Sequence, residues 1–204
     1  VCVAIESVSV YFVATISGIF IGIGMIILLF TNIFRTIQKI HIIEEKRHQT
    51  ELEIEKKENK KITLQMMQTL STTIEAKDEY TRGHSKRVAQ YATLIAKSLG
   101  WTKDEIQNIK SCAYLHDIGK IGIPDQILNK PGKLTQEEFN LIKQHTIIGQ
   151  DIVKDVTIIP HLDEVTRSHH EHYDGSGYPD GLKGNEIPIQ ARIIAIADSY
   201  DAMN

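Results

Sequence analysis

A long uncharged stretch near the N-terminus sets the strongest constraint on how this chain folds. Residues 7–34 contain no charged side chain, and residues 8–30 are almost wholly apolar. At about 1.5 Å per residue, a helix over residues 8–30 is roughly 35 Å long, which is enough to cross the hydrocarbon core of a bilayer. A signal peptide is the competing interpretation, but no basic segment precedes the stretch and its length exceeds a usual signal-peptide core. We therefore expect residues 7–34 to form a transmembrane helix.

The charges that flank this stretch predict its orientation. Glu6 is the one charged residue before it. Basic residues follow it at Arg35, Lys39, Lys46 and Arg47. Because basic residues are enriched on the cytoplasmic side of membrane spans, residues 1–6 are expected to be a remnant outside the cytoplasm and the rest of the chain to lie inside it. The chain has no initiator Met, so we expect it to begin within a longer protein that crosses the lipid bilayer once.

Residues 35–75 are predicted to form one long polar helix. No proline occurs before Pro124, so nothing interrupts a helix here, and residues 44–61 carry many charges of both signs. Apolar residues recur at helical spacing after this charged centre, at Ile62, Met66, Leu70 and Ile74. Two interpretations stay open: a solvated spacer, or a signalling helix that pairs two copies of the chain as a homodimer, through a broken coiled coil and the transmembrane helix.

The overall composition excludes several classes of protein. The formal net charge is −3, so a broad basic surface for nucleic acid is not indicated, and we expect no nucleic-acid partner. The two cysteines, Cys2 and Cys112, stand far apart, which excludes a disulfide scaffold and a zinc ribbon. Residues 76–204 instead read as a compact all-α domain that is rich in histidine.

Five expected helices of this domain each place a His or an Asp in line with their apolar face. In the first of them, His84 is in step with Val88, Tyr91, Ile95 and Leu99. Two of the others begin at capping boxes, Thr102 with Glu105 and Thr135 with Glu138. The aligned polar residues are His84, His116, His145, His169 or the adjacent His170, and Asp198. One inward His is ordinarily a satisfied core residue, but five converging stripes, with Asp117 beside His116, predict a metal centre because cations compensate buried imidazoles and carboxylates together.

The ligand types indicate the metals and their chemistry. Imidazole and carboxylate without thiolate favour Fe, Mn or Zn, and the candidates are too many for one ion, so we expect two metals that share a carboxylate. Two adjacent metals activate a bridging water and neutralise charge on a phosphoryl group, which predicts hydrolysis of a phosphate ester or diester. Lys120 lies one helical turn after His116, where its ammonium could meet a phosphate oxygen; a solvated lysine is the alternative.

Two segments resemble the signatures of a known family. Residues 116–120, HDIGK, resemble the signature of the HD phosphohydrolase superfamily. Residues 169–179, HHEHYDGSGYP, are similar to the second signature of its HD-GYP family, whose members hydrolyse the bacterial second messenger cyclic di-GMP. Residues 82–85, RGHS, match further, and the resemblance runs from about Glu75 to the end of the chain. The resemblance implies an HD-type helical bundle. Because cyclic di-GMP is a bacterial messenger, the resemblance also implies that the single transmembrane helix lies in a bacterial cell membrane.

The resemblance also implies roles for individual residues. One metal would be held by His84, His116, Asp117 and Asp198, and the other by His145, His169 and His170, with Asp117 bridging the two. The implied catalytic residues are Asp117 and Lys120, the latter on the scissile phosphate. The implied nucleotide site consists of Lys120, Asp174, Gly175, Gly177, Tyr178 and Pro179. For the Tyr178 ring, stacking on a purine and packing of the loop are equally open.

Two departures from the family pattern refine these expectations. Some members hold three metals with a Glu four residues before the first His ligand, but Tyr80 stands here. We therefore expect two divalent ions, Fe or Mn. The chain ends at Asn204, where the closing helices of the family should follow, so the domain over residues 76–204 is expected to be incomplete.

The predicted function is that of a membrane-anchored cyclic di-GMP phosphodiesterase. A hydroxide that bridges the metals would open the ring, with pGpG or GMP as the end product. Two alternatives stay open: an HD hydrolase of another cyclic dinucleotide, and a non-catalytic cyclic di-GMP receptor or interaction module. The presence of every expected ligand up to Asp198 counts against the last.

Overall fold

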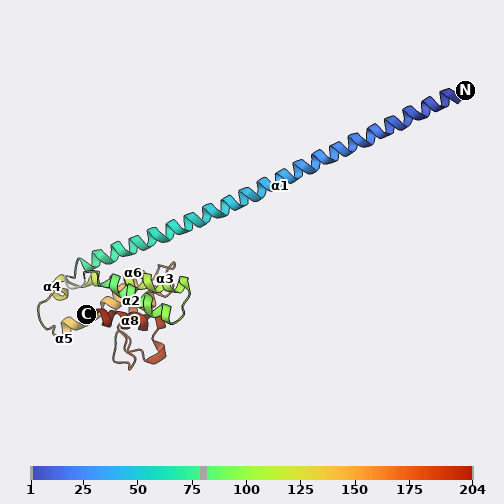
Figure 1. Cartoon of the computed structure of the whole chain (residues 1–204). Coiled ribbons are helices and arrows are strands. Elements are labelled where there is room, and N and C mark those ends of the chain that lie inside the picture. The colour runs from blue at the N-terminus through green and yellow to red at the C-terminus, as the bar shows by residue number, and fades with distance from the viewer. Residues whose placement is uncertain (1, 79–81, 204) are drawn as a thin grey trace. The chain divides into compact units, whose positions relative to one another are not determined.

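The computed structural model describes residues 2–78 and 82–203, and every regular element in these ranges is helical (Figure 1). The predicted all-α class is therefore confirmed. The chain divides into two compact units, Val1–Asn59 and Lys60–Asn204, which are described separately below. Tyr80, on which the expected number of metals partly depends, lies outside the described residues.

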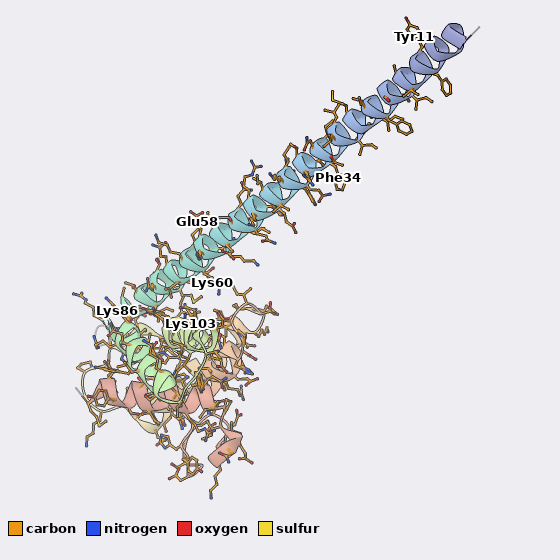
Figure 2. The ribbon with its side chains drawn as sticks, turned by 45° about the vertical axis from the view of Figure 1, so that its right-hand side comes forward. Tyr11, Phe34, Glu58, Lys60, Lys86 and Lys103 are labelled. Atoms are coloured by element: carbon orange, nitrogen blue, oxygen red, sulfur yellow. The ribbon has the colours of Figure 1, made fainter. Side chains whose placement is uncertain are left out.

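The first unit consists of the N-terminal part of helix α1, which spans Cys2–Glu75. All side chains over residues 11–59 are exposed, and Figure 2 shows them projecting around the helix between Tyr11 and Glu58. By length and composition alone, this helix is apolar enough in its N-terminal part to cross a membrane. Its threonine hydroxyls are satisfied locally: that of Thr15 donates to the Phe12 carbonyl at 2.8 Å and that of Thr31 to the Leu28 carbonyl at 2.9 Å. Such bonds meet the requirement that polar groups in a bilayer be paired internally.

The second unit begins with the C-terminal turns of α1. Here Met67, Ser71 and Ile74 are buried. The face expected from sequence is displaced from this one, because Ile62, Met66 and Leu70 are at least half-exposed and only Ile74 of that set is covered. The helix therefore packs on the domain through a mixed face, and the more apolar stripe stays outside.

Nine further described elements of this unit have the following bounds. The longer helices are α2 (His84–Ser98), α3 (Lys103–Leu115), α5 (Gln136–Lys143), α6 (His145–Val153), α7 (Leu162–Ser168) and α8 (Ile189–Ala202). The shorter ones are the 3-10 helices η1 (Ile118–Gly122) and η2 (Gly184–Glu186), with the single-turn helix α4 (Asp125–Leu128) as a ninth. Both predicted capping boxes are present, at the starts of α3 and α5.

Small residues let the helices of the core approach closely. Helix α2 packs against α3 and α8 mainly through Ala89, Ala92 and Ala96, which are fully buried. The predicted stripe of α2 is partly wrong, since Leu99 at its C-terminus is 55% exposed. Between η1 and α6 the approach is closer still: a side chain at Gly119 would place its Cβ 1.8 Å from the His145 carbonyl oxygen. Glycine at this position thus lets the segment after Asp117 lie directly on the first turn of α6.

Candidate metal centre

The ends of several helices bring the predicted ligands together. His116 caps the C-terminus of α3 and Asp117 follows it, while His145 opens α6. His169 caps the C-terminus of α7, and His170 is next in the chain. His84 opens α2 and Asp198 lies on α8. Because a helix end leaves backbone groups and side chains free of the regular ladder, these positions can face one common space.

Four of these residues form what we call the three-histidine group: Asp117, His145, His169 and His170. Their ligand atoms all lie within 4.8 Å of one another. Nε2 of His145 is 3.4 Å from Oδ1 of Asp117, and Nε2 of His169 is 3.7 Å from the same oxygen. His145 and His169 are fully buried, and burial lowers the pKa of His145 to about 4. The His145 ring is therefore neutral at neutral pH.

The arrangement of the ring nitrogens fits a cation. The Nδ1 atoms of His145 and His169 lie 2.7 and 2.8 Å from the carbonyl oxygens of Ile142 and Thr166. A carbonyl only accepts, so Nδ1 is the donor in each ring and Nε2 is the atom left to face the other residues of the group. These two Nε2 atoms lie 3.3 Å apart beside the Asp117 carboxylate. A divalent cation bound by both nitrogens and the carboxylate would compensate these buried groups together.

The other candidate ligands form what we call the His84 group: His84, His116 and Asp117, with ligand atoms again within 4.8 Å. Nε2 of His116 is 3.5 Å from Oδ2 of Asp117. Asp198 adjoins this group, since its Oδ1 lies 3.0 Å from Nε2 of His84. Burial lowers the pKa of His84, but Asp198 and Asp201 more than offset this and raise it to about 8. Asp117 thus belongs to both groups, as a bridging ligand would.

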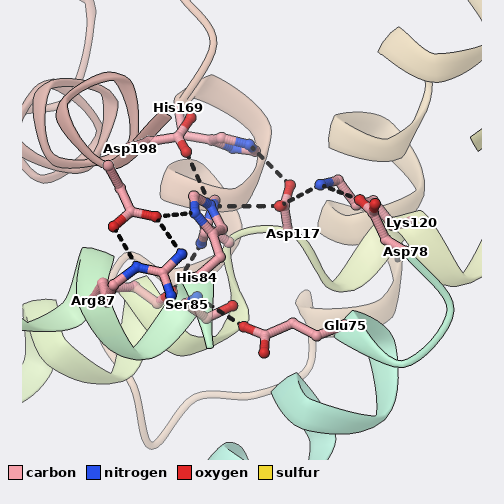
Figure 3. A network of polar contacts seen from close by, with 12 residues as sticks. Glu75, Asp78, His84, Ser85, Arg87, Asp117, Lys120, His169 and Asp198 are labelled. Atoms are coloured by element: carbon pink, nitrogen blue, oxygen red, sulfur yellow. Dashed lines mark hydrogen bonds and ion pairs between the residues drawn. The ribbon is translucent and has the colours of Figure 1, made fainter. Parts of the chain in front are cut away.

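Asp117 is kept ionised by its neighbours. Burial alone would raise the pKa of this carboxyl group, but the Lys120 ammonium and His116 hold it well below its ordinary value. Nζ of Lys120 lies 2.8 Å from Oδ2 of Asp117 and 3.1 Å from Oδ2 of Asp78. In Figure 3 the Asp117 carboxylate lies between His169 and Lys120. Burial lowers the pKa of Lys120, yet Asp117 and then Asp78 raise it overall, so this side chain is a fixed cation at the edge of the cluster.

The loop that was predicted to shape the nucleotide site lies beside the three-histidine group. The Tyr178 ring stacks on His170 with centroids 4.9 Å apart and planes inclined by 28°. Nζ of Lys143 lies 5.8 Å from the Tyr178 ring centroid. The half-buried ring thus packs on the histidines, and stacking on a purine stays a prediction. The peptide bond between Tyr178 and Pro179 is cis.

Two other predicted contacts of this loop serve its own conformation. The Asp174 carboxylate accepts hydrogen bonds from the Ser176 amide at 2.9 Å and the Ser176 hydroxyl at 2.6 Å. A side chain at Gly177 would place its Cβ 2.3 Å from the His172 amide nitrogen, and Gly175 has a φ of +84°. The glycines are therefore required by close backbone approach and by left-handed backbone, whatever they contribute to ligand binding.

Several residues that support the centre escaped the sequence analysis. Glu171 is buried, and its carboxylate accepts the backbone amides of Asp180, Gly181 and Leu182 at 2.7, 3.1 and 3.0 Å. Glu171 stands between His170 and His172 in the second signature. An acidic residue among histidines was therefore a usable sequence signal for a residue that supports the centre. Glu75 accepts the amides of Gly83 and Ser85, and Asp201 and Arg87 adjoin His84. No spacing rule connects those pairs.

Comparisons with known proteins agree with this geometry. The profile of a family described as "HD domain" matches residues 68–204. The chain is 47% identical over 141 residues to a cyclic di-GMP phosphodiesterase of Thermotoga maritima, covering 68% of this chain and 38% of that protein. It is 40% identical over 141 residues to a 3′3′-cGAMP-specific phosphodiesterase of Vibrio cholerae, covering 68% of this chain and 27% of that protein.

A solved structure shares the fold. Bd1817 of Bdellovibrio bacteriovorus, described as an HDG"Y"P protein, superposes with a TM-score of 0.52 at 25% identity, over 59% of this chain and 40% of that one. The chain spans less than two fifths of the length of the two curated relatives described above.

Proposed function

Since the chain belongs to the HD domain family and is of the HD-GYP type, we propose that it hydrolyses a cyclic dinucleotide, cyclic di-GMP, with two divalent metal ions at this centre. The observation that carries the proposal is the pair of Nε2 atoms of His145 and His169, which lie 3.3 Å apart beside Asp117 while each Nδ1 is held by a backbone carbonyl. A cluster with this arrangement is poorly suited to hold a core together on its own. It is well suited to hold a cation.

The proposed ligands follow the two groups. One ion would be held by His145, His169 and His170 and the other by His84, His116 and Asp198, with Asp117 between them. Fe or Mn suits this donor set, which has imidazoles and carboxylates and no thiolate. When bound, two such ions supply an activated water and neutralise charge on a phosphoryl group.

The remaining roles belong to side chains of the protein. The Lys120 ammonium would donate to a non-bridging oxygen of the scissile phosphate, since it is fixed 2.8 Å from Asp117 and 16% of its side chain is exposed. Hydrolysis adds the oxygen of water to phosphorus, breaks the bond from phosphorus to the 3′ oxygen and passes a proton to that leaving oxygen. The ring then opens to linear pGpG, and a second round would give GMP. The loop over residues 174–179 would bound the nucleotide site.

We extend the proposal to the N-terminal helix. Residues 7–34 would cross the bacterial cell membrane once, residues 35–75 would link the span to the domain, and residues 76–204 would carry the phosphohydrolase in the cytoplasm. The length and apolar composition of the helix support this, together with the basic residues that follow it. Retention of the full chain in membranes washed with alkaline carbonate is expected, and its release by that wash would contradict a membrane span.

Another cyclic dinucleotide is the second candidate substrate, because a relative named for 3′3′-cGAMP is 40% identical to this chain. Both candidates share phosphodiester chemistry and differ in one base. A direct competition separates them: the full chain in nanodiscs, loaded anaerobically with Mn(II), is given equal concentrations of cyclic di-GMP and 3′3′-cGAMP. Faster formation of pGpG supports the first substrate, and faster loss of 3′3′-cGAMP supports the second.

Absence of any product from a folded, metal-loaded chain would contradict the enzymatic proposal. Calorimetric titration with cyclic di-GMP would then test the receptor alternative. Chelation by EDTA should abolish turnover, and restoring Mn(II) should recover it. The variant Lys133→Met changes an exposed lysine and serves as a control for preparation effects.

A further inference from the structure

One histidine of the centre is held differently from three others. Nδ1 of His116, like that of His145 and His169, lies 2.7–2.8 Å from the carbonyl oxygen of the residue three positions earlier. His84 opens its helix, and its Nδ1 lies 2.7 Å from Oδ2 of Asp201, a residue 117 positions away on α8. The same ring nitrogen therefore faces a neutral dipole in three histidines and a carboxylate in the fourth.

The Asp201 carboxylate is itself clamped. Nε of Arg87 lies 2.7 Å from its Oδ1, and the second nitrogen of the guanidinium fork lies 2.9 Å from its Oδ2. Only 3% of the Asp201 side chain is exposed. The guanidinium fork is planar and matches a carboxylate, so a bidentate pair fixes the plane of Asp201 as well as its position. Both oxygens are thereby directed away from the ligand atoms and toward His84 and Arg87.

We propose that Arg87 and Asp201 form a positioning pair that orients His84 and selectively strengthens the ion site of the His84 group. The inference rests on the two-metal centre proposed above. With Nδ1–H donated to Asp201, Nε2 of His84 is left to bind the ion, and an anionic acceptor makes the imidazole a better donor than a carbonyl does. The three-histidine group contains no such carboxylate among the described contacts of its Nδ1 atoms. Its ion should be indifferent to Asp201.

The chain contains a matched ion pair that serves as the control. Nε of Arg167 lies 2.6 Å from Oδ2 of Asp180, and its fork reaches Oδ1 at 2.7 Å. This pair has the same bidentate geometry and joins α7 to the loop after Pro179. It makes no described contact with a ligand histidine. Asp180→Asn therefore removes a carboxylate from an ion pair of the same geometry without touching His84, at a side chain that is 35% exposed against 3% for Asp201.

The experiment compares Asp201→Asn with Asp180→Asn in the full chain in nanodiscs. An asparagine oxygen can still accept from His84, while the asparagine NH2 would face one donor of the Arg87 fork, so the first variant removes the charge and half of the clamp and keeps an acceptor for His84. Mn(II) is titrated against a fluorescent chelator, and bound Mn per chain is measured after dialysis. We expect two ions in the wild type and in Asp180→Asn. In Asp201→Asn one of the two affinities should fall by about 10- to 100-fold and the other should stay unchanged.

Two further variants identify the weakened site and test the pair. In Asp201→Asn with His145→Ala, both sites are impaired and less than one ion per chain should remain after dialysis. Arg87→Lys keeps the charge and loses the fork, so its loss of affinity should lie between those of wild type and Asp201→Asn. The melting temperature of the metal-free protein separates positioning from folding: it should fall similarly in the Asp201 and Asp180 variants.

The outcomes are distinct for the two proposals. Two ions bound by Asp201→Asn with wild-type affinities would overturn the positioning role and leave the proposed function standing. Equal weakening of both ions in Asp201→Asn, or matching losses in Asp180→Asn, would also overturn it, because a structural defect explains either result. A folded wild type that binds no Mn(II) or Fe(II) would overturn the two-metal centre itself.

Discussion

The two ligand groups of the centre are built by different means. The three-histidine group draws on local structure, because the ring nitrogens of His145 and His169 are fixed by carbonyls three residues earlier and His170 is adjacent in sequence. The His84 group depends on distant contacts, since His84 meets Asp198 and Asp201 of α8 only when α2 packs on that helix. A single domain can thus hold one group of candidate ligands formed by helix ends and another formed by the docking of two helices.

This difference implies that the two sites respond differently to change. The ends of α6 and α7 fix the rings of His145 and His169 through nearby carbonyls, so the three-histidine group should tolerate small shifts between α2 and α8. The His84 group should not tolerate such shifts, because its contacts join these two helices. Asp117 belongs to both groups, so a change at this residue should affect both.

The largest effect is expected from Asp117→Asn, which removes the shared carboxylate. Both groups then lose a ligand, and Lys120 loses its nearest counter-charge. We expect neither ion to be retained after dialysis and no detectable hydrolysis of cyclic di-GMP. Metal analysis and product chromatography check this, with Asp180→Asn as the control. One ion retained at full affinity would show that Asp117 serves a single site.

The residues that the structure brings together at the centre were largely predictable from sequence, and the reason is local. His116, Asp117 and His145 stand at helix ends in step with apolar residues, and the second signature contains His169 and His170. The fold class and both capping boxes were predictable for the same reason. The role of residues within the loop was less accessible, because the partners of Asp174 and Tyr178 depend on how the loop closes.

What sequence could not provide is contact between distant segments. The buried side of α2 includes the predicted His84 and Val88 but is completed by Ala89, Ala92 and Ala96, whereas the periodicity of large residues extends to Leu99, which is exposed. The partners of His84 and Arg87 at Asp201 lie more than a hundred positions away. The homodimer, the membrane insertion and the domain boundaries stay predictions, since no contact between described residues bears on them.

A second, smaller effect is expected from Lys120→Met. The variant keeps every ligand atom, so two ions should remain bound, but the phosphate loses a fixed ammonium. Loss of one preorganised donor costs about 10²- to 10³-fold in kcat. Steady-state kinetics of pGpG formation measure this, with Lys133→Met as the control. If kcat is unchanged and an ion is lost instead, Lys120 acts on the centre and not on the substrate.

Glu171→Ala separates the two groups by a different route. It leaves three part-buried backbone amides, of Asp180, Gly181 and Leu182, without their acceptor, and each of them that water cannot reach costs about 1–3 kcal/mol. Because Glu171 follows His170, the ion of the three-histidine group should weaken while that of the His84 group is kept. Urea unfolding followed by Trp101 fluorescence reports on the second unit, since the chain has one tryptophan. Glu171→Gln, which keeps an acceptor, should lose less.

The smallest effect is a pH dependence of the free energy of unfolding of the metal-free protein. The contributions of His84 and His145 to it have opposite signs. The pKa of His84 is raised from 6.5 to about 8 by Asp198 and Asp201 against the effect of burial. Its contribution to stability is therefore complete below pH 6.5 and is lost as pH rises through 8, at about 1.4 kcal/mol per pKa unit, or about 2 kcal/mol in total. Burial lowers the pKa of His145 to about 4, so its contribution is complete above pH 6.5 and falls as pH drops toward 4.

The metal-free protein should therefore be most stable near pH 6.5. The alkaline limb is assigned to His84, and the acid limb to His145 together with His116 and His170, whose pKa values are also lowered by burial. Urea unfolding in EDTA between pH 5 and pH 9, again followed by Trp101, measures both limbs. Asp201→Asn should flatten the alkaline limb alone, because it removes a carboxylate that raises the pKa of His84 and leaves His145 untouched. An alkaline limb of wild-type size in this variant would mean that Asp198 alone holds the His84 proton and that the Asp201 carboxylate adds nothing measurable to it.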